Sequence, residues 1–348
     1  MIGKIKDNKK YTSLLFIFLL IIVLTYYNIF SENSIKTIIH NMATIKYEYI
    51  VICFFVIFLY FLLQGLYVKI ILKSLNTKIK LKNGMFYSLV EFYFSGITPS
   101  STGGQPVELY YMTKDKIPVR KSYITLLLNT IFFKLVLIIL GVLALYFRPE
   151  YIFDYSIIYI VFFVIGALVD IAMIIICYML LFKQKNVKAI INWLKRIGNK
   201  IKFIKSSVDK INTEEVLKDY KVELKYIKNS KFSMLMAFLV TFIQRLLLFS
   251  IAYIIYRSLG FSTYSYFDLL LIQVSVQIAI EALPLPGGTG LSEKTFQTIF
   301  ITVFGLSFAD TAMLLTRTFS FYIPLIASGI IVLIHFIITK KRIKLKKQ

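Results

Sequence analysis

Two hydrophobic segments of this chain are each interrupted by a turn rich in proline and glycine. The first interruption reads Gly-Ile-Thr-Pro-Ser-Ser-Thr-Gly-Gly-Gln-Pro at residues 96–106, and the second reads Glu-Ala-Leu-Pro-Leu-Pro-Gly-Gly-Thr-Gly at residues 281–290. Lipid offers no water to satisfy free backbone N–H and C=O groups, so a broken helix at membrane depth must be buried in protein or line a polar cavity. One such break in each half of a chain is typical of transporters that bind a substrate between discontinuous helices.

The composition around these turns indicates a membrane protein. Hydrophobic residues make up 58% of the 348 residues, and several apolar runs are long enough to cross a bilayer. We predict one all-α, polytopic transmembrane domain over residues 1–348, in which the interrupted regions 85–112 and 267–304 form two re-entrant helix pairs. The first apolar run is interpreted as a retained helix, not a cleaved signal. Full spans are expected at 11–30, 49–72, 123–147, 157–182, 232–257 and 312–338.

The distribution of Lys and Arg predicts the orientation of the spans. Of the 41 Lys and Arg residues, 33 lie in the N-terminal segment, residues 69–82, 114–121 and 183–231, and the tail 340–347, whereas the opposite connections hold four. Because positive residues accumulate on the cytoplasmic side, we expect both termini in the cytoplasm. The first broken pair then enters from the cytoplasm and the second from outside, as an inverted repeat would produce.

The basic segment 183–231 carries apolar residues at helical spacing. We expect a basic amphipathic helix on the anionic inner leaflet, either a plain connector or a lipid-sensing element. The sequence has no glycine-rich nucleotide loop, catalytic triad pattern or metal-ligand spacing, so we predict no cofactor, no metal and no nucleic-acid partner. Cys53 and Cys177 lie in apolar runs and are interpreted as packing residues.

The first turn is dense in small hydrogen-bonding groups. A helix that restarts there presents unpaired N–H groups and the positive end of its dipole. Pro106 suits the first turn of such a helix, and glycine lets a ligand approach the backbone. We predict binding of an anionic group such as a lipid phosphate, although Ser and Thr alternatively only satisfy the broken backbone. The candidate residues are Thr98, Ser100, Ser101, Thr102, Gly103, Gly104, Gln105 and Glu108.

A polar stripe leads into the second turn, because Gln273, Gln277 and Glu281 are spaced by four residues. Charged residues within membrane segments are costly and are functional candidates by default. We expect Arg245 and Arg317 to contact the substrate or to pair with acids, and we assign no catalytic residue. The remaining substrate-binding candidates of this half, beside Gln277 and Glu281, are Pro286, Gly287, Gly288, Thr289, Gly290 and Glu293.

The two turns together resemble a known family. The blocks at 96–108 and 283–290, with Glu293 and with Arg317 ahead of Pro324, resemble the lysylphosphatidylglycerol synthase transmembrane region. That region is the flippase half of the multiple peptide resistance factor, and the resemblance covers nearly the whole chain. It implies a flippase fold in a bacterial plasma membrane. It also implies transfer of a phospholipid, for example aminoacylated (lysyl-)phosphatidylglycerol, whose outward exposure protects bacteria from cationic antimicrobial peptides.

Three functions follow from these observations. The first is a lipid flippase or scramblase, not an enzyme by itself, with membrane phospholipids as partners. The second is the membrane component of a phosphatidylglycerol lysyltransferase or another head-group-modifying enzyme. It would need a separately encoded soluble aminoacyltransferase or glycosyltransferase, because nothing in this sequence resembles the soluble acyltransferase domain of the full-length factor. The third is a small-solute or ion transporter, and a homo-oligomer is compatible with all three.

Overall fold

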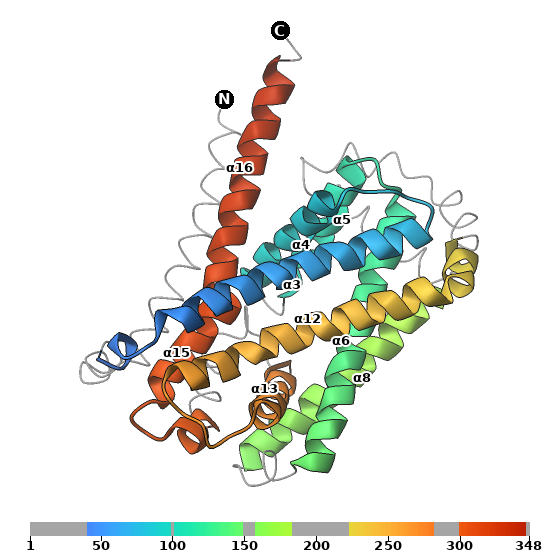
Figure 1. Ribbon diagram of the computed structural model, residues 1–348. Coiled ribbons are helices and arrows are strands. Elements are labelled where there is room, and N and C mark those ends of the chain that lie inside the picture. The colour runs from blue at the N-terminus through green and yellow to red at the C-terminus, as the bar shows by residue number, and fades with distance from the viewer. Residues whose placement is uncertain (1–39, 99–100, 149–156, 183–222, 282–298, 346–348) are drawn as a thin grey trace, which may run out of the picture.

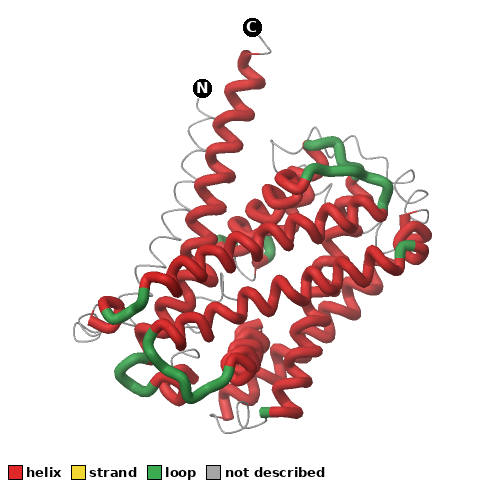
Figure 2. The backbone as a smooth tube through the Cα atoms, viewed as in Figure 1, coloured by secondary structure: helices red, strands yellow, loops and turns green. Residues whose placement is uncertain are grey.

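The computed structural model describes residues 40–98, 101–148, 157–182, 223–281 and 299–345. In these ranges the chain forms helices joined by connecting segments, without a strand (Figures 1 and 2). The principal elements are α3 (Tyr47–Ser74), α4 (Leu81–Gly96), α5 (Gly104–Lys114), α6 (Val119–Phe147), α8 (Ile157–Phe182), α12 (Lys231–Ser258), α13 (Tyr266–Glu281), α15 (Ala309–Arg317), η3 (Thr318–Tyr322) and α16 (Ile323–Leu345).

Five helices in the described ranges are long and apolar enough to cross a membrane. They are α3, α6, α8, α12 and the continuous helix Ala309–Thr339 formed by α15, η3 and α16. These helices confirm the five spans predicted between residues 49 and 338, and with them an all-helical, polytopic architecture. The sixth predicted span, 11–30, lies outside the described residues.

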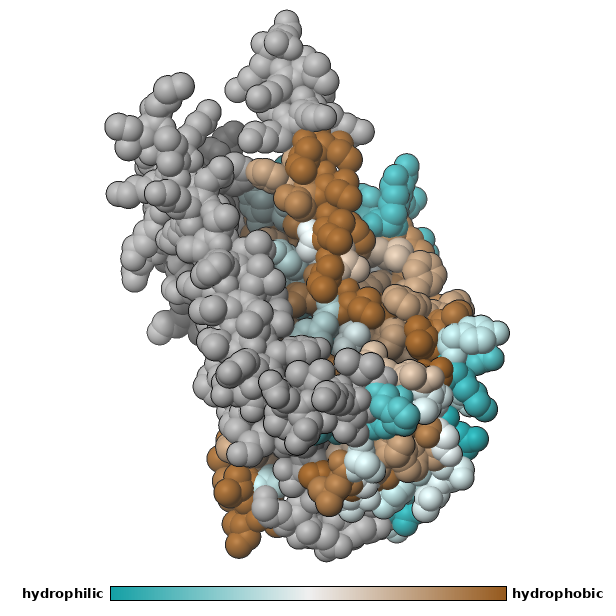
Figure 3. Space-filling model, turned by 90° about the vertical axis from the view of Figure 1, so that its left-hand side faces the viewer, coloured by the Kyte–Doolittle hydropathy of each residue, from teal (hydrophilic) through white to brown (hydrophobic). Residues whose placement is uncertain are grey.

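The outer surface of the bundle is apolar over large areas. On α8, Ile157 and Leu168 are 79% and 59% exposed, and on α16 Ile326 and Leu333 are 63% and 58% exposed. Apolar side chains dominate much of the described surface in the space-filling view (Figure 3). Large apolar side chains exposed along the length of membrane-spanning helices indicate contact with lipid, which solvates such side chains without cost.

The buried apolar residues form two clusters, one toward each end of the long helices. On α6 the boundary between the two clusters falls between Ile131 and Val136, and on α3 it falls between Phe61 and Tyr67. Helices α8 and α12 likewise contribute one end to the first cluster and the other end to the second cluster. Buried and half-buried polar side chains lie around the boundary between the two clusters, and we call them the polar layer. Its residues are Gln64, Asn129, Thr130, Lys134, Asp170, Thr241, Gln244 and Arg245.

Short helices run into the polar layer from opposite ends of the bundle. Helices α4 and α5 pack as a hairpin, whose open end is marked by a 2.7 Å hydrogen bond from the Tyr87 hydroxyl to Asp115 beside the start of α6. Helix α13 starts at the other end of α6, where Arg148 Nε lies 2.7 Å from Asp268. Figure 1 shows the hairpin and α13 on opposite sides of the middle of α12. Their re-entrant placement in a bilayer stays a prediction.

Glycines bring the short helices against the long ones. A Cβ atom at Gly84 of α4 would overlap the carbonyl oxygen of Gly65 on α3. A Cβ atom at Gly166 of α8 would overlap the carbonyl oxygen of Ile278 on α13, and one at Gly141 of α6 would lie 2.6 Å from the Ile278 side chain. Helix α13 therefore packs between α6 and α8, with a backbone contact at Gly166 that only glycine permits and a side-chain contact at Gly141.

Two further sequence interpretations can be compared with the structure. Cys53 and Cys177 are buried free thiols, which confirms their interpretation as packing residues. Most of the basic segment 183–231 lies outside the described residues. Its described end carries Glu223, whose carboxylate lies 3.1 Å from Arg120 Nε and 3.8 Å from Lys121 Nζ at the start of α6. This end of the segment therefore lies at the same end of the bundle as the opening of the α4–α5 hairpin.

Candidate functional site

A three-residue ion cluster lies in the polar layer where α13 ends. Lys134 Nζ on α6 is 2.7 Å from Asp170 Oδ1 on α8 and 2.7 Å from Glu281 Oε2, the last residue of α13. The three side chains are 8%, 0% and 21% exposed, respectively. Charge-assisted bonds of this length are strong, and two carboxylates share one ammonium group. The cluster joins three helices in the middle of the bundle.

The predicted stripe on α13 leads to this cluster. Gln277 donates a 3.2 Å hydrogen bond to Glu281 Oε1, as their four-residue spacing predicted. Glu281 thus uses one oxygen for Gln277 and the other for Lys134. The other candidates of this half, Pro286, Gly287, Gly288, Thr289, Gly290 and Glu293, lie outside the described residues.

Arg245 lies in the same layer on α12 and is surrounded by aromatic rings. Its guanidinium carbon is 3.8 Å from the centroid of Phe133 and 5.7 Å from that of Tyr60, and its Nη1 lies 3.5 Å from the Tyr60 hydroxyl. Phe133 adjoins Lys134 in sequence, so Arg245 and the ion cluster approach the same part of α6. Arg245 is half-buried, and within the described ranges it contacts Phe133 and Tyr60 through cation–π interactions rather than a short ion pair.

Arg317 lies at the other end of an aromatic chain that begins at Arg245. Its guanidinium carbon is 4.9 Å from the Phe321 centroid, Phe321 lies 6.3 Å from Phe92, and Phe92 lies 6.3 Å from Tyr60. This aromatic chain takes one residue from each of five elements, in the spatial order α15, η3, α4, α3 and α12. The two arginines predicted as substrate contacts therefore lie at the two ends of one set of rings. The π-helical turn η3 follows Arg317 directly. We attribute it to Pro324, which cannot donate to the preceding turn.

The first turn shows how its hydroxyl groups support the broken backbone. Thr98 donates to the carbonyl of Phe94 at 2.6 Å and accepts the N–H of Gly103 at 2.9 Å. Ser95 donates to Glu91 at 3.0 Å. A Cβ atom at Gly104 would overlap Ser95 Oγ. Thr98 and Gly104 are therefore used for turn and helix packing, whereas Ser101 has a φ of 54° and Thr102 is exposed beside it. Ser100 lies outside the described residues.

Helix α5 carries the two polar candidates that point away from the turn. Gln105 donates a 2.6 Å hydrogen bond to Thr130, one helical turn from Lys134 on α6. The first broken pair and α13 therefore contact α6 one turn apart. Glu108 is 1% exposed, and its Oε2 has no hydrogen-bond partner among the described residues. A buried carboxyl with an unused oxygen is costly, so it marks a functional candidate or a protonated group.

Two members of the site were not assigned a partner from the sequence. Lys134 and Asp170 are charged residues within predicted spans, but Lys134 pairs with Asp170, which is 36 residues away, and with Glu281, which is 147 residues away. The one available signal was the rule that buried membrane charges pair. The closeness of α13 to α6 and α8 depends on Gly141 and Gly166, which no motif in the sequence marks.

Comparison with known proteins identifies the family of this chain. No curated protein and no solved structure matched in these comparisons. The family model described as the lysylphosphatidylglycerol synthase TM region matches residues 12–328. The match includes both interrupted segments, the ion cluster and both arginines of the aromatic chain. The chain belongs to the lysylphosphatidylglycerol synthase TM region family, whose members are membrane proteins linked to lipid handling.

Proposed function

We propose that this chain is a flippase or scramblase that moves a phospholipid between the leaflets of a bacterial plasma membrane. One observation carries the proposal. A polar layer divides two apolar clusters in mid-bundle, and the α4–α5 hairpin and α13 end at it from opposite sides. A polar head group needs such a layer to cross a hydrocarbon core, while its acyl chains stay in lipid along the apolar outer surface.

The charges in and next to the polar layer suit a head group that carries both signs. The aromatic chain ends in two arginines, which bind phosphate well through their forked donors. Glu108, Glu281 and Asp170 supply carboxylates for an amine, although the last two are neutralised by Lys134 in this conformation. A lysyl or other amino group on the lipid would compete with Lys134 for Glu281. Aminoacylated phosphatidylglycerol is therefore the cargo that we propose to test first.

We also propose the orientation that the charge asymmetry predicts, with both termini in the cytoplasm. The open end of the α4–α5 hairpin then faces the cytoplasm and the Arg148–Asp268 pair faces outward. A lipid made on the inner leaflet would reach the hairpin first. No nucleotide-binding motif occurs in the sequence, so we propose movement that is downhill or coupled to an ion.

Leaflet exchange in proteoliposomes tests this function. Purified full-length chain is reconstituted, and exchange of labelled lysyl-phosphatidylglycerol and phosphatidylglycerol is followed. Arg245→Gln is compared with Arg257→Gln, the same change at an exposed arginine at the end of the same helix. We expect the first variant to slow exchange at least about tenfold, the loss for one charged contact of roughly 1.4 kcal/mol, and the second to keep the wild-type rate.

Three results would overturn all or part of the proposal. Exchange no faster than in empty liposomes would favour the membrane-subunit function, and co-purification of a soluble transferase would then be examined. Equal rates for both arginine variants would leave transfer intact but would remove Arg245 from the pathway. An acceleration of a small solute's flux without lipid exchange would instead favour the solute-transporter function.

A further inference from the structure

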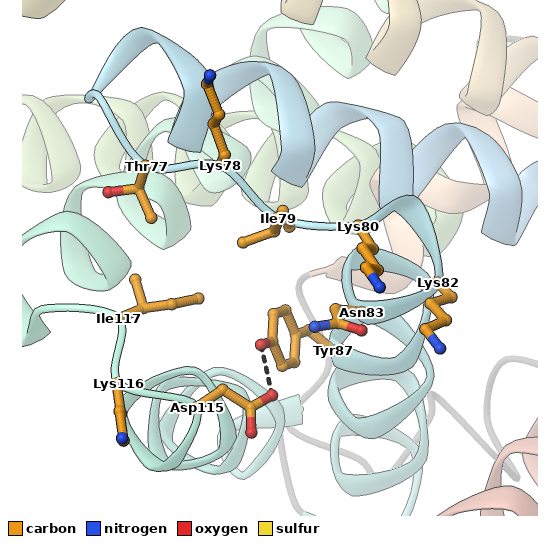
Figure 4. Close-up of a pocket in the computed structure, with 10 residues that line it drawn as sticks. All are labelled: Thr77, Lys78, Ile79, Lys80, Lys82, Asn83, Tyr87, Asp115, Lys116 and Ile117. Carbon is orange, nitrogen blue, oxygen red and sulfur yellow. Dashed lines mark hydrogen bonds between the residues drawn. The ribbon is translucent and has the colours of Figure 1, made fainter.

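A pocket opens at the lysine-rich end of the bundle, away from the polar layer. It has a volume of about 540 Å³ and lies between the α3–α4 and α5–α6 connections. Figure 4 shows Tyr87 in the middle of the pocket, with Ile79 and Ile117 on its inner wall and the lysine side chains toward the rim. Its floor is therefore apolar and aromatic, and its rim is charged.

The rim has a strong excess of positive charge. Lys78, Lys80, Lys82 and Lys116 line the pocket, and each of these side chains is exposed. Among the described residues, Asp115 is the one carboxylate in the lining, and it accepts a 2.7 Å hydrogen bond from the buried Tyr87 hydroxyl. Among the described lining residues, four lysines are thus balanced by one carboxylate. This excess of positive charge around the pocket favours a bound anion.

A second source of positive potential is the start of α4, which borders the same pocket. The N-cap residue of this helix is Lys80, whose side chain makes no capping hydrogen bond. Lys82 and Asn83, in the first turn, line the pocket. The first amide groups of a helix of 16 residues carry the positive end of its dipole, which favours an anion.

Both connections that form the pocket are held in defined conformations. Helix α3 ends with Asn76 at a φ of 54°, and the N–H of Thr77 bonds the carbonyl of Leu72 at 2.8 Å. Helix α5 ends in the same way, with Lys116 at a φ of 65° and the N–H of Ile117 bonding an earlier carbonyl. These are Schellman-type helix ends. The rim lysines are therefore carried on a preformed frame, which lowers the entropy lost on binding.

We propose that this pocket binds a phosphate-bearing anion. Lysine ammonium groups and a helix N-terminus are the donors that bind phosphate in proteins, and basic pockets between membrane helices bind anionic head groups. The phosphate lies at the lysine rim and its organic part contacts Tyr87, Ile79 and Ile117. The source is either an anionic membrane lipid or a soluble organic phosphate. This inference concerns equilibrium binding at a second site and does not depend on lipid transfer.

Lysine footprinting on the full chain in phosphatidylcholine nanodiscs tests the pocket. Acetylation rates are measured by mass spectrometry for the rim lysines, with the exposed Lys69 and Lys73 on α3 as internal controls. One arm replaces part of the phosphatidylcholine with phosphatidylglycerol, and the other adds inorganic pyrophosphate at matched ionic strength. We expect acetylation of Lys80, Lys82 and Lys116 to slow severalfold, with the controls unchanged.

Each outcome of the two arms has a defined meaning. Protection by phosphatidylglycerol alone supports a lipid head group, and protection by pyrophosphate alone supports a soluble phosphate. Lys82→Gln should weaken binding about fivefold, the equivalent of roughly 1 kcal/mol per cation, and Lys69→Gln should not. Protection that is absent in both arms, or equal at Lys69 and the rim, overturns the proposal. None of these results alters the leaflet-exchange assay, so the two proposals fail separately.

Discussion

Replacing Lys134 by Met tests the ion cluster most directly. Methionine has a similar length and keeps the side-chain volume, so the change removes little besides the charge. It leaves Asp170 and Glu281, which are 0% and 21% exposed, without their shared cation. Breaking a buried pair by removing one partner typically costs about 3–5 kcal/mol, because the remaining charge is buried without compensation.

The magnitude can also be worked from the proton that Asp170 would take up. A fully buried carboxylate without a cation is neutralised instead. Protonating a carboxyl whose unfolded pKa is about 3.9 costs about 4 kcal/mol at pH 7. The folded variant then holds a proton that the unfolded chain has released. Its stability therefore rises by about 1.4 kcal/mol for each unit that the pH falls, down to about pH 4.

The assay is equilibrium unfolding of the detergent-solubilised chain by a second, denaturing detergent, at pH 7 and pH 5. We expect Lys134→Met to lose about 4 kcal/mol at pH 7 and less than half of that at pH 5. Adding Asp170→Asn should recover most of the loss at pH 7. The control Lys69→Met, at an exposed position, should change stability by less than about 0.5 kcal/mol. A loss that does not depend on pH, or that Asp170→Asn does not repair, would refute this account of the cluster.

Three further predictions address packing, backbone strain and pH. Gly166→Ala should destabilise the chain by about 3 kcal/mol, because its Cβ would overlap a main-chain carbonyl of α13; thermal unfolding in detergent measures this. Lys116→Gly should stabilise the chain by roughly 1 kcal/mol in the same assay, since φ of 65° is strained for lysine, while it weakens anion protection of the pocket. Burial alone would raise the pKa of Asp268, at the end of the bundle, but hydrogen bonds from Ser265 and Arg148 outweigh it and hold the pKa below its usual value. The resulting stability is present above about pH 4 and is lost as the pH falls through the folded pKa. The difference in free energy of unfolding between wild type and Asp268→Asn should therefore become smaller at acidic pH.

The sequence predicted the long helices well because their signal is local. Each of the spans 49–72, 123–147, 157–182 and 232–257 lies within four residues of its helix at both ends. A helix satisfies its own backbone, and lipid requires a long apolar run, so composition alone locates it. The interruption at 96–106 was also found, because proline and glycine act on their own neighbours.

The arrangement of the site was less predictable because it depends on distant pairs. Gln277 and Glu281 were expected to align through their spacing and they do, but no spacing relates Lys134 to Asp170 or to Glu281. Gly104 was predicted as a ligand contact, and the structure shows it packed against Ser95. Whether the turn residues bind a ligand stays a prediction. The aromatic chain between Arg245 and Arg317 combines five elements, which no single-sequence pattern encodes.

The short length of α4 and α5 has a consequence for how the chain is assembled during synthesis. With 16 and 11 residues, neither helix crosses a bilayer alone, and Gln105 and Glu108 make their entry into lipid unfavourable. Gln105 finds its partner on α6, which the ribosome makes later. We therefore expect the hairpin to stay at the membrane surface until α6 has been inserted and offers Thr130. In this view the hairpin would enter the membrane after α6, against the order of synthesis.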